Sequence, residues 1–155
     1  MIDTIDLPGR YADPDLKPAK QPAEISSAML SRITAELNKV RFTQEDIALF
    51  VGEYLSEPKA QIYFDAPEEN LTRARFLQHA KKNGVKLSLK SLMLHRSNYI
   101  FINGTSFEVG DDDLAILKEL ANVRSLSGTL ITSASADVID ALHTWHKDGW
   151  LLLGS

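Results

Sequence analysis

The chain has 155 residues, of which 44% are hydrophobic and 25% charged, which is ordinary for a globular protein of one domain or two small ones. It contains no cysteine, so disulfides, thiolate metal sites and cysteine nucleophiles are excluded. The chain does not open on a basic segment followed by an apolar one, and its longest apolar runs fall far short of the roughly 20 residues of a membrane span. These features predict a cytoplasmic protein outside the membrane.

The formal net charge of −4 argues weakly against a polyanionic partner, but the charge is unevenly distributed. The first 70 residues carry seven basic and thirteen acidic side chains, whereas residues 71–155 carry ten and eight, with no acid between Glu69 and Glu108. This stretch, residues 70–107, could bind RNA, DNA or an acidic partner, or it could be a solvated face; its low charge density favours the solvated face. Its basic residues are Arg73, Arg75, Lys81, Lys82, Lys86, Lys90 and Arg96.

The N-terminal part divides into an arm and a helical segment. Residues 1–22 hold four of the six prolines, which predicts an extended arm rather than a helix. Residues 23–69 predict two amphipathic helices and a linker, with Thr43 and Asp46 placed as a capping box before the second helix and Pro58 after it. The apolar stripes of the two helices are Ile25, Met29, Ile33, Leu37 and Val40, then Ile47, Phe50, Val51, Tyr54 and Leu55.

Residues 70–155 have a different pattern. Leu71, Ala74, Leu77 and Ala80 predict a helix that ends at Asn83-Gly84. Asn103-Gly104 predicts a type I′ hairpin between strands 99–102 and 105–109. Further helices are expected behind N-caps at 111–113 and at Ser133 or Ser135, and a last buried strand at 150–153. The fold class is therefore α+β, mainly α: a helical segment followed by a winged-helix domain.

Residues that could carry chemistry are few. His143 and His146 are three apart on an expected helix, and His146-Lys147-Asp148 has the His-x-Asp spacing of an iron site. Such a site needs a third ligand from a distant strand, whereas this triplet stands at a helix end. No phosphate-binding glycine motif and no activated serine is found. A stand-alone metalloenzyme is therefore the weakest hypothesis.

The two apolar stripes can form a private core or an interface. Two amphipathic helices bury only one face each, so they need a further element to cover them. That element could be the second domain, a partner copy or an absent part of the chain, and a partner copy is the interpretation that we favour.

Several pieces of the sequence, in order, resemble one known layout. They are the arm from Gly9 to Leu16 (GRYADPDL) with Pro18 and Pro22, the segment from Tyr54 to Lys59 (YLSEPK), the hairpin Ile102-Asn103-Gly104, and the ending Trp145 to Leu151. This layout is similar to the region that follows the catalytic barrel in bacterial cupin-type (JmjC-like) ribosomal-protein hydroxylases, the ribosomal oxygenase family of 2-oxoglutarate-dependent dioxygenases. The resemblance covers nearly the whole chain.

The resemblance implies a function for the parent enzyme. Full-length members use Fe(II) and 2-oxoglutarate to hydroxylate an arginine or histidine of a ribosomal protein, and they carry dimerisation helices and a winged helix after the barrel. The barrel with its iron ligands is absent here, so no catalytic, metal or cosubstrate residue can be carried over. The dimerisation role can be carried over, onto Ile25, Met29, Ile33, Leu37, Ile47, Phe50 and Val51.

The leading hypothesis is thus a non-catalytic C-terminal module that forms a homodimer and supports the scaffold or substrate docking. The alternative is a winged-helix nucleic-acid-binding protein that uses residues 70–107, whose binding would weaken steeply with salt. The sequence disfavours this alternative, because few residues of the expected helix before the wing could read bases.

Overall fold

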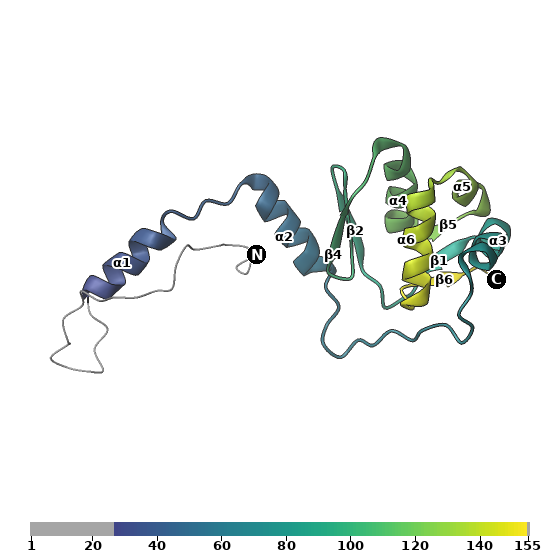
Figure 1. Ribbon diagram of the computed structural model, residues 1–155, viewed down its shortest axis with the longest axis horizontal. Helices are drawn as coiled ribbons and strands as arrows, with labels where there is room; N and C mark the ends of the chain where they lie inside the picture. Colours follow the sequence, from purple (N-terminus) through teal and green to yellow (C-terminus); the bar gives the residue numbers. More distant parts are fainter. Residues whose placement is uncertain (1–26, 155) are drawn as a thin grey trace. The chain divides into compact units, whose positions relative to one another are not determined.

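The computed structural model describes residues 27–154 (Figure 1). The chain forms two units, residues 1–47 and residues 48–155, and each is described by itself. The helices are α1 (Ser27–Leu37), α2 (Gln44–Ser56), α3 (Arg73–Asn83), α4 (Asp111–Val123), α5 (Gly128–Ser133) and α6 (Ala136–Lys147). The strands are β1 (Val85–Leu87), β2 (Met93–Arg96), β3 (Tyr99–Ile102), β4 (Thr105–Glu108), β5 (Ser125–Leu126) and β6 (Leu151–Leu153).

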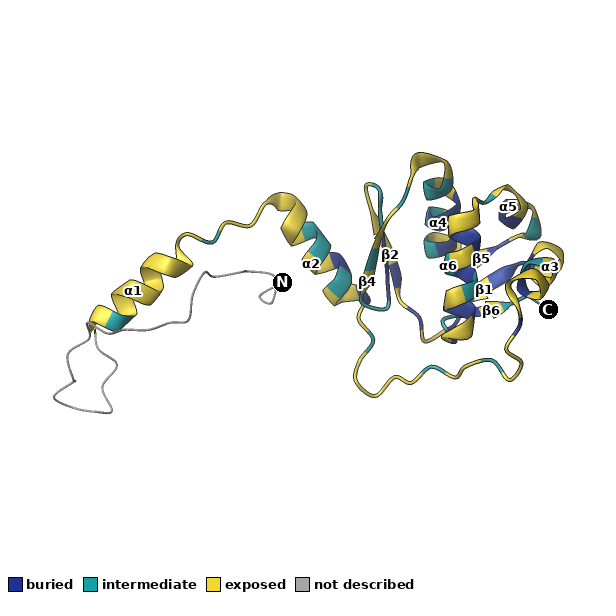
Figure 2. Ribbon diagram, viewed as in Figure 1, coloured by how far each residue is buried: buried dark blue, intermediate teal, exposed yellow. Residues whose placement is uncertain are grey.

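The first unit, where it is described, consists of α1 and the start of α2. No residue of α1 is buried, and Figure 2 shows it almost wholly exposed. The expected capping box begins α2: the Thr43 amide donates to Asp46 Oδ2 over 2.8 Å, and the Asp46 amide donates to Thr43 Oγ1 over 3.1 Å. The bond with Thr43 also lowers the pKa of Asp46 below its ordinary value. The arm at 1–22 and Ile25 lie outside the described residues.

The second unit is a winged helix with two small antiparallel sheets. One sheet has the order β5-β1-β6 and contacts α3, α4 and α6, while α5 packs on α3; the other sheet, the wing, has the order β2-β3-β4. A single apolar core joins these elements and includes Phe76, Ile100, Leu120, Leu142 and Leu151, each fully buried (Figure 2).

The helix ends follow from local capping, with two departures from expectation. Gly84 ends α3 at φ 74°, and the Ser135 side chain caps α6, as expected. The aspartates at 111–113 occupy the first turn of α4 instead of capping it, because Gly110 is the N-cap residue. Their charges still suit the positive end of the helix. Ser127 caps α5, a six-residue helix that the sequence pattern did not predict.

The wing hairpin confirms the predicted Asn-Gly turn. Asn103 has φ 48° and Gly104 has φ 86°, the two positive values that a type I′ turn requires. Cross-strand pairing aligns Leu94, Phe101 and Ser106 on one face of the sheet and His95, Ile100 and Phe107 on the other. Ile100 belongs to the winged-helix core, so the face of the wing that carries Phe101 points away from this core.

The linker after α2 is held against the winged helix. The Lys90 ammonium donates to the Tyr63 carbonyl over 2.8 Å and to Asp65 Oδ2 over 2.7 Å. This cation lowers the pKa of Asp65 below its ordinary value. Phe64 contacts the ring of Trp150, with ring centroids 6.2 Å apart. Within residues 27–154, no helix has the length and hydropathy needed to cross a membrane.

Candidate dimerisation surface

Helix α2 has two unlike faces in its second half. Gly52 and Ser56, four residues apart, are buried, whereas the residues opposite them on the helix are exposed (Figure 2). The buried face is thus small and polar, and the exposed face is apolar. This reverses the usual arrangement of an amphipathic helix on a core.

The small face of α2 rests on the outer face of the wing. A Cβ atom added at Gly52 would lie less than 3.0 Å from three atoms of the Phe101 ring, so the ring packs directly on the helix backbone. Phe101 is 2% exposed, yet it does not belong to the winged-helix core. The burial of Phe101 therefore depends on α2.

Hydrogen bonds fix the end of α2 on the same hairpin. The Gly104 amide donates to Ser56 Oγ over 3.1 Å, and Ser56 Oγ donates to the Glu53 carbonyl over the same distance. Ser106 Oγ donates to Glu53 Oε1 over 2.6 Å. We call this arrangement, in which Gly52, Glu53 and Ser56 contact Phe101, Gly104 and Ser106, the α2 seat.

The opposite face of α2 is a continuous apolar stripe that no described residue buries. It comprises Phe50, Val51, Tyr54 and Leu55, which are 41–65% exposed and which we call the α2 stripe. The rings of Phe50 and Tyr54 stack on one another with centroids 5.8 Å apart, so even the aromatic contact stays within the stripe. Monomeric proteins seldom leave so much contiguous apolar surface uncovered, and such surfaces mark interaction sites.

Helix α1 carries a second uncovered stripe. Ile33 and Leu37 are exposed, as is Leu30 beside them, while Met29 is partly buried. Leu30, Ile33 and Leu37 therefore lie exposed on the apolar side of α1, in which no residue is buried. The remaining expected interface residue, Ile47, is 49% exposed. Every predicted interface residue that the structure describes thus has surface available for a partner.

The seven basic residues of the acid-free stretch are all exposed, but three are engaged in ion pairs. Arg73 binds Asp140, Arg75 binds Glu69 over 3.3 Å, and Lys90 binds Asp65. Among residues 27–154, no ion pair involves the other four, which are Lys81, Lys82, Lys86 and Arg96.

The geometry of α5 and α6 bears on the nucleic-acid alternative. Two residues separate α5 from α6, and in helix-turn-helix DNA-binding proteins the second of two such consecutive helices enters the major groove. The exposed positions of α6 include Asp137 and Asp140 against a single Lys147, and the exposed Asp148 follows as its C-cap residue. A helix with this balance repels phosphate, so α6 is unsuited to the groove.

His143 and His146 hold α6 against its neighbours. His143 Nε2 donates to the Leu71 carbonyl over 2.9 Å, and the buried His146 donates through Nδ1 to the Leu151 carbonyl over 3.0 Å. Both rings pack on Phe76, with centroid distances of 5.4 and 5.3 Å. No group of three histidine, aspartate or glutamate side chains that could hold a metal ion occurs in the described part of the chain. The side chains that the structure describes therefore do not supply the donor set of an iron centre.

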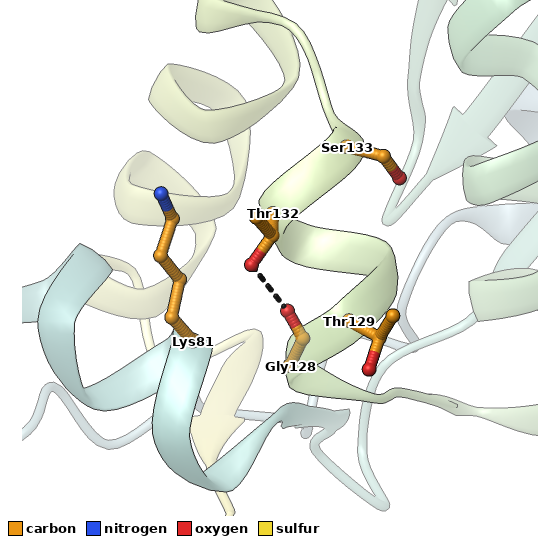
Figure 3. Close-up of a pocket in the computed structure, with 5 residues that line it drawn as sticks. All are labelled: Lys81, Gly128, Thr129, Thr132 and Ser133. Carbon is orange, nitrogen blue, oxygen red and sulfur yellow. Dashed lines mark hydrogen bonds between the residues drawn. The ribbon is translucent and has the colours of Figure 1, made fainter.

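A shallow hollow lies between α3 and α5, lined by Lys81, Gly128, Thr129, Thr132 and Ser133 (Figure 3). Thr132 Oγ1 donates to the Gly128 carbonyl over 2.9 Å, and Ser133 Oγ donates to the Leu130 carbonyl. These two hydroxyls satisfy their own helix, so they are not available as donors to an anion.

Sequence reasoning missed the α2 seat. Two signals could have revealed it. Glycine is unfavourable inside a helix unless a close contact requires it, and Gly52 stands in the middle of α2. The run Tyr99 to Ile102 is apolar without alternation, which indicates a strand covered on both faces.

The fold of the second unit defines a winged-helix module. Residues 39–152 match the sequence model of the ROXA-like winged helix family, and because this match covers most of the chain, the chain belongs to that family. No curated protein matches the sequence.

Solved structures of a ribosomal oxygenase from Escherichia coli, YcfD, are similar in fold. One matches with a TM-score of 0.67 at 16% sequence identity, and the match covers 94% of this chain and 39% of the YcfD chain. Another, in complex with cobalt and 2-oxoglutarate, has a TM-score of 0.64 at 17% identity and covers 96% and 41%. The chain thus spans about two fifths of the length of these structures.

Proposed function

We propose that this chain is the non-catalytic C-terminal module of an Fe(II)- and 2-oxoglutarate-dependent ribosomal-protein hydroxylase, acting on an arginine or histidine of its substrate. In this role the module forms a homodimer and supports the scaffold or the docking of the substrate. Family membership and the fold shared with a ribosomal oxygenase support the parent enzyme. The uncovered α2 stripe supports dimerisation, and it is the single observation on which the proposal depends most.

The physical argument is that the uncovered stripes need a partner. Burying apolar surface is worth about 25 cal/mol per Å², so four large side chains on one helix face are costly to leave in water. A twofold-symmetric contact buries the same patch on both copies, which makes a second copy the simplest partner for a stripe that none of residues 27–154 buries. The α1 stripe, with Ile33 and Leu37 exposed, is a separate apolar surface that a partner could also cover.

The test is the oligomeric state of two α1 variants in sedimentation velocity. Ile33→Glu places a charge on the apolar side of α1, and Ser31→Glu places the same charge at an exposed position on the opposite side. Glutamate is a good helix former, so α1 is retained in both variants. We expect a dimer for the wild type and for Ser31→Glu and a weakened dimer for Ile33→Glu. Equal association of the two variants would remove α1 from the interface.

The non-catalytic role has its own test. With Fe(II), 2-oxoglutarate and a ribosomal-protein substrate supplied, we expect no 2-oxoglutarate turnover by this chain. Turnover above that of a heat-denatured sample would overturn the proposal, because it would require a cosubstrate site within these 155 residues.

Nucleic-acid binding through residues 70–107 is the rival function. It would rest on the four basic residues of this stretch that no described ion pair involves, none of which belongs to α6. Binding through phosphate contacts has a salt slope of about −0.7 to −0.9 per contact. Anisotropy of labelled RNA and duplex DNA between about 50 and 200 mM salt distinguishes the two functions. A steep slope that Lys81→Glu and Lys82→Glu reduce would favour the rival, and the absence of binding would favour the dimerisation module.

A further inference from the structure

Helix α2 of the same chain covers part of the outer face of the wing. The outer face of the hairpin holds Phe101 against Gly52 and carries the Gly104 and Ser106 bonds to α2. The interaction is specific in shape, since any side chain at Gly52 would overlap the Phe101 ring. The wing is thus a docking surface for a helix with small residues four positions apart.

The seat also determines which way α2 faces. Residues four apart in a helix lie on one side, so fixing Gly52 and Ser56 against the hairpin fixes the opposite side as well. That side is the α2 stripe. Without the seat, α2 could turn over and cover Phe101 with its own apolar stripe, because burial of apolar surface does not depend on direction. The close contact at Gly52 and the hydrogen bonds from Gly104 to Ser56 and from Ser106 to Glu53 favour the small face of the helix instead.

We infer that the outer face of the wing acts as a positioning site for dimerisation: Phe101, Gly104 and Ser106 orient helix α2 so that its apolar stripe is presented to a second copy. This inference rests on the proposed function, and it adds that residues outside the interface control the strength of the dimer. Gly52 and Ser56 are positioning residues, because they act on the partner copy only through the stripe on the other side of their helix.

Two variants test the seat without touching the stripe. Gly52→Leu drives a side chain into the Phe101 ring and forces α2 off the wing. Ser56→Ala removes the acceptor of the Gly104 amide and leaves the helix intact. The control for Ser56→Ala is Ser133→Ala, which removes the same kind of bond to a carbonyl three residues earlier, from Ser133 Oγ to Leu130, but breaks no contact with the wing.

The measurement is the dimer dissociation constant of the full chain by sedimentation equilibrium, with circular dichroism and hydrogen exchange to follow the fold. We expect the constant to rise at least tenfold for Gly52→Leu and severalfold for Ser56→Ala, with no change for Ser133→Ala. Amides of α2 should exchange faster while those of α4 and α6 stay protected. If Gly52→Leu fails to fold, Ser56→Ala carries the test.

The outcomes separate this inference from the proposed function. A wild-type dimer that Phe50→Glu dissociates, but that both seat variants leave at an unchanged dissociation constant, would overturn the positioning role and keep dimerisation. A wild type that is monomeric at every concentration would overturn both.

Discussion

Because Gly52 contacts the Phe101 ring, the effect of Gly52→Ala on the free energy of unfolding should change sign when that ring is removed. Alanine in place of a helical glycine stabilises a helix by about 1 kcal/mol. At Gly52 the added Cβ would overlap three ring atoms of Phe101, and overpacking of this kind costs about 1–3 kcal/mol. We therefore expect Gly52→Ala to destabilise the fold by about 0–2 kcal/mol.

Removal of the ring should reverse the effect. Phe101→Val deletes all three overlapping atoms and keeps a side chain that strands favour. In that background Gly52→Ala should stabilise the fold by about 1 kcal/mol, so the coupling between the two positions is about 1–3 kcal/mol.

The assay is urea unfolding of the four proteins of this double-mutant cycle, each also carrying Phe50→Glu so that association does not enter the free energy of unfolding. A coupling below about 0.5 kcal/mol would refute the reasoning, because positions in direct contact do not behave additively. It would mean that α2 does not rest on the Phe101 ring.

Three further predictions concern the winged helix and its linker. Gly128→Ala should lower stability by about 1–3 kcal/mol in thermal unfolding, because its Cβ would overlap the Lys81 backbone carbonyl. Gly110→Ala meets no atom within 4 Å and should cost less, about 0.5–1 kcal/mol for the poorer N-cap of α4. His146→Phe should destabilise by about 1–3 kcal/mol through the lost bond to a backbone carbonyl, with bound metal measured by mass spectrometry unchanged. The ion pair with Lys90 lowers the pKa of Asp65, so its stabilising effect is present above the ordinary pKa and is lost as pH falls through the folded one. Below about pH 4, Asp65→Asn should therefore lose less stability than the wild type in acid unfolding. The first prediction would be contradicted if Gly110→Ala lost as much stability as Gly128→Ala. The second would be contradicted if His146→Phe lost a stoichiometric metal ion, and the third if wild type and Asp65→Asn lost stability equally as the pH falls.

Local signals in the sequence predicted much of the fold. Asn103-Gly104 requires a particular turn, Thr43 with Asp46 requires a particular helix start, and Gly84 requires a helix end; all three occur. Each depends only on backbone conformation within a few residues, which the sequence determines directly.

What depends on packing between distant segments could not be predicted. The helix at 73–83 buries Phe76 rather than Ala74, because Phe76 meets the two histidines of α6, about 70 residues further along the chain. The compact unit begins at Ala48, so it includes the second half of a helix that its apolar stripe alone assigns to a separate dimerisation segment. The buried face of that helix consists of Gly52 and Ser56. Neither residue is a large apolar one, so hydrophobic periodicity could not predict that this face is buried.

The same limit applies to the candidate site. Periodicity correctly identified Phe50 and Val51 as one apolar stripe, but periodicity cannot distinguish a stripe that is buried from one that is left exposed. Only the contact of the opposite face with the wing shows that this stripe is uncovered.

The most direct test of the dimerisation role is the solution mass by light scattering across a concentration series, for the wild type, Phe50→Glu and Leu89→Glu. Phe50 belongs to the α2 stripe, whereas Leu89 is 96% exposed in the loop before the wing, so Leu89→Glu controls for replacing an exposed apolar residue by a charge. We predict dimers for the wild type and Leu89→Glu and a monomer for Phe50→Glu. A wild type that is monomeric throughout, or a Phe50→Glu variant that stays dimeric, would contradict the proposed role of the α2 stripe.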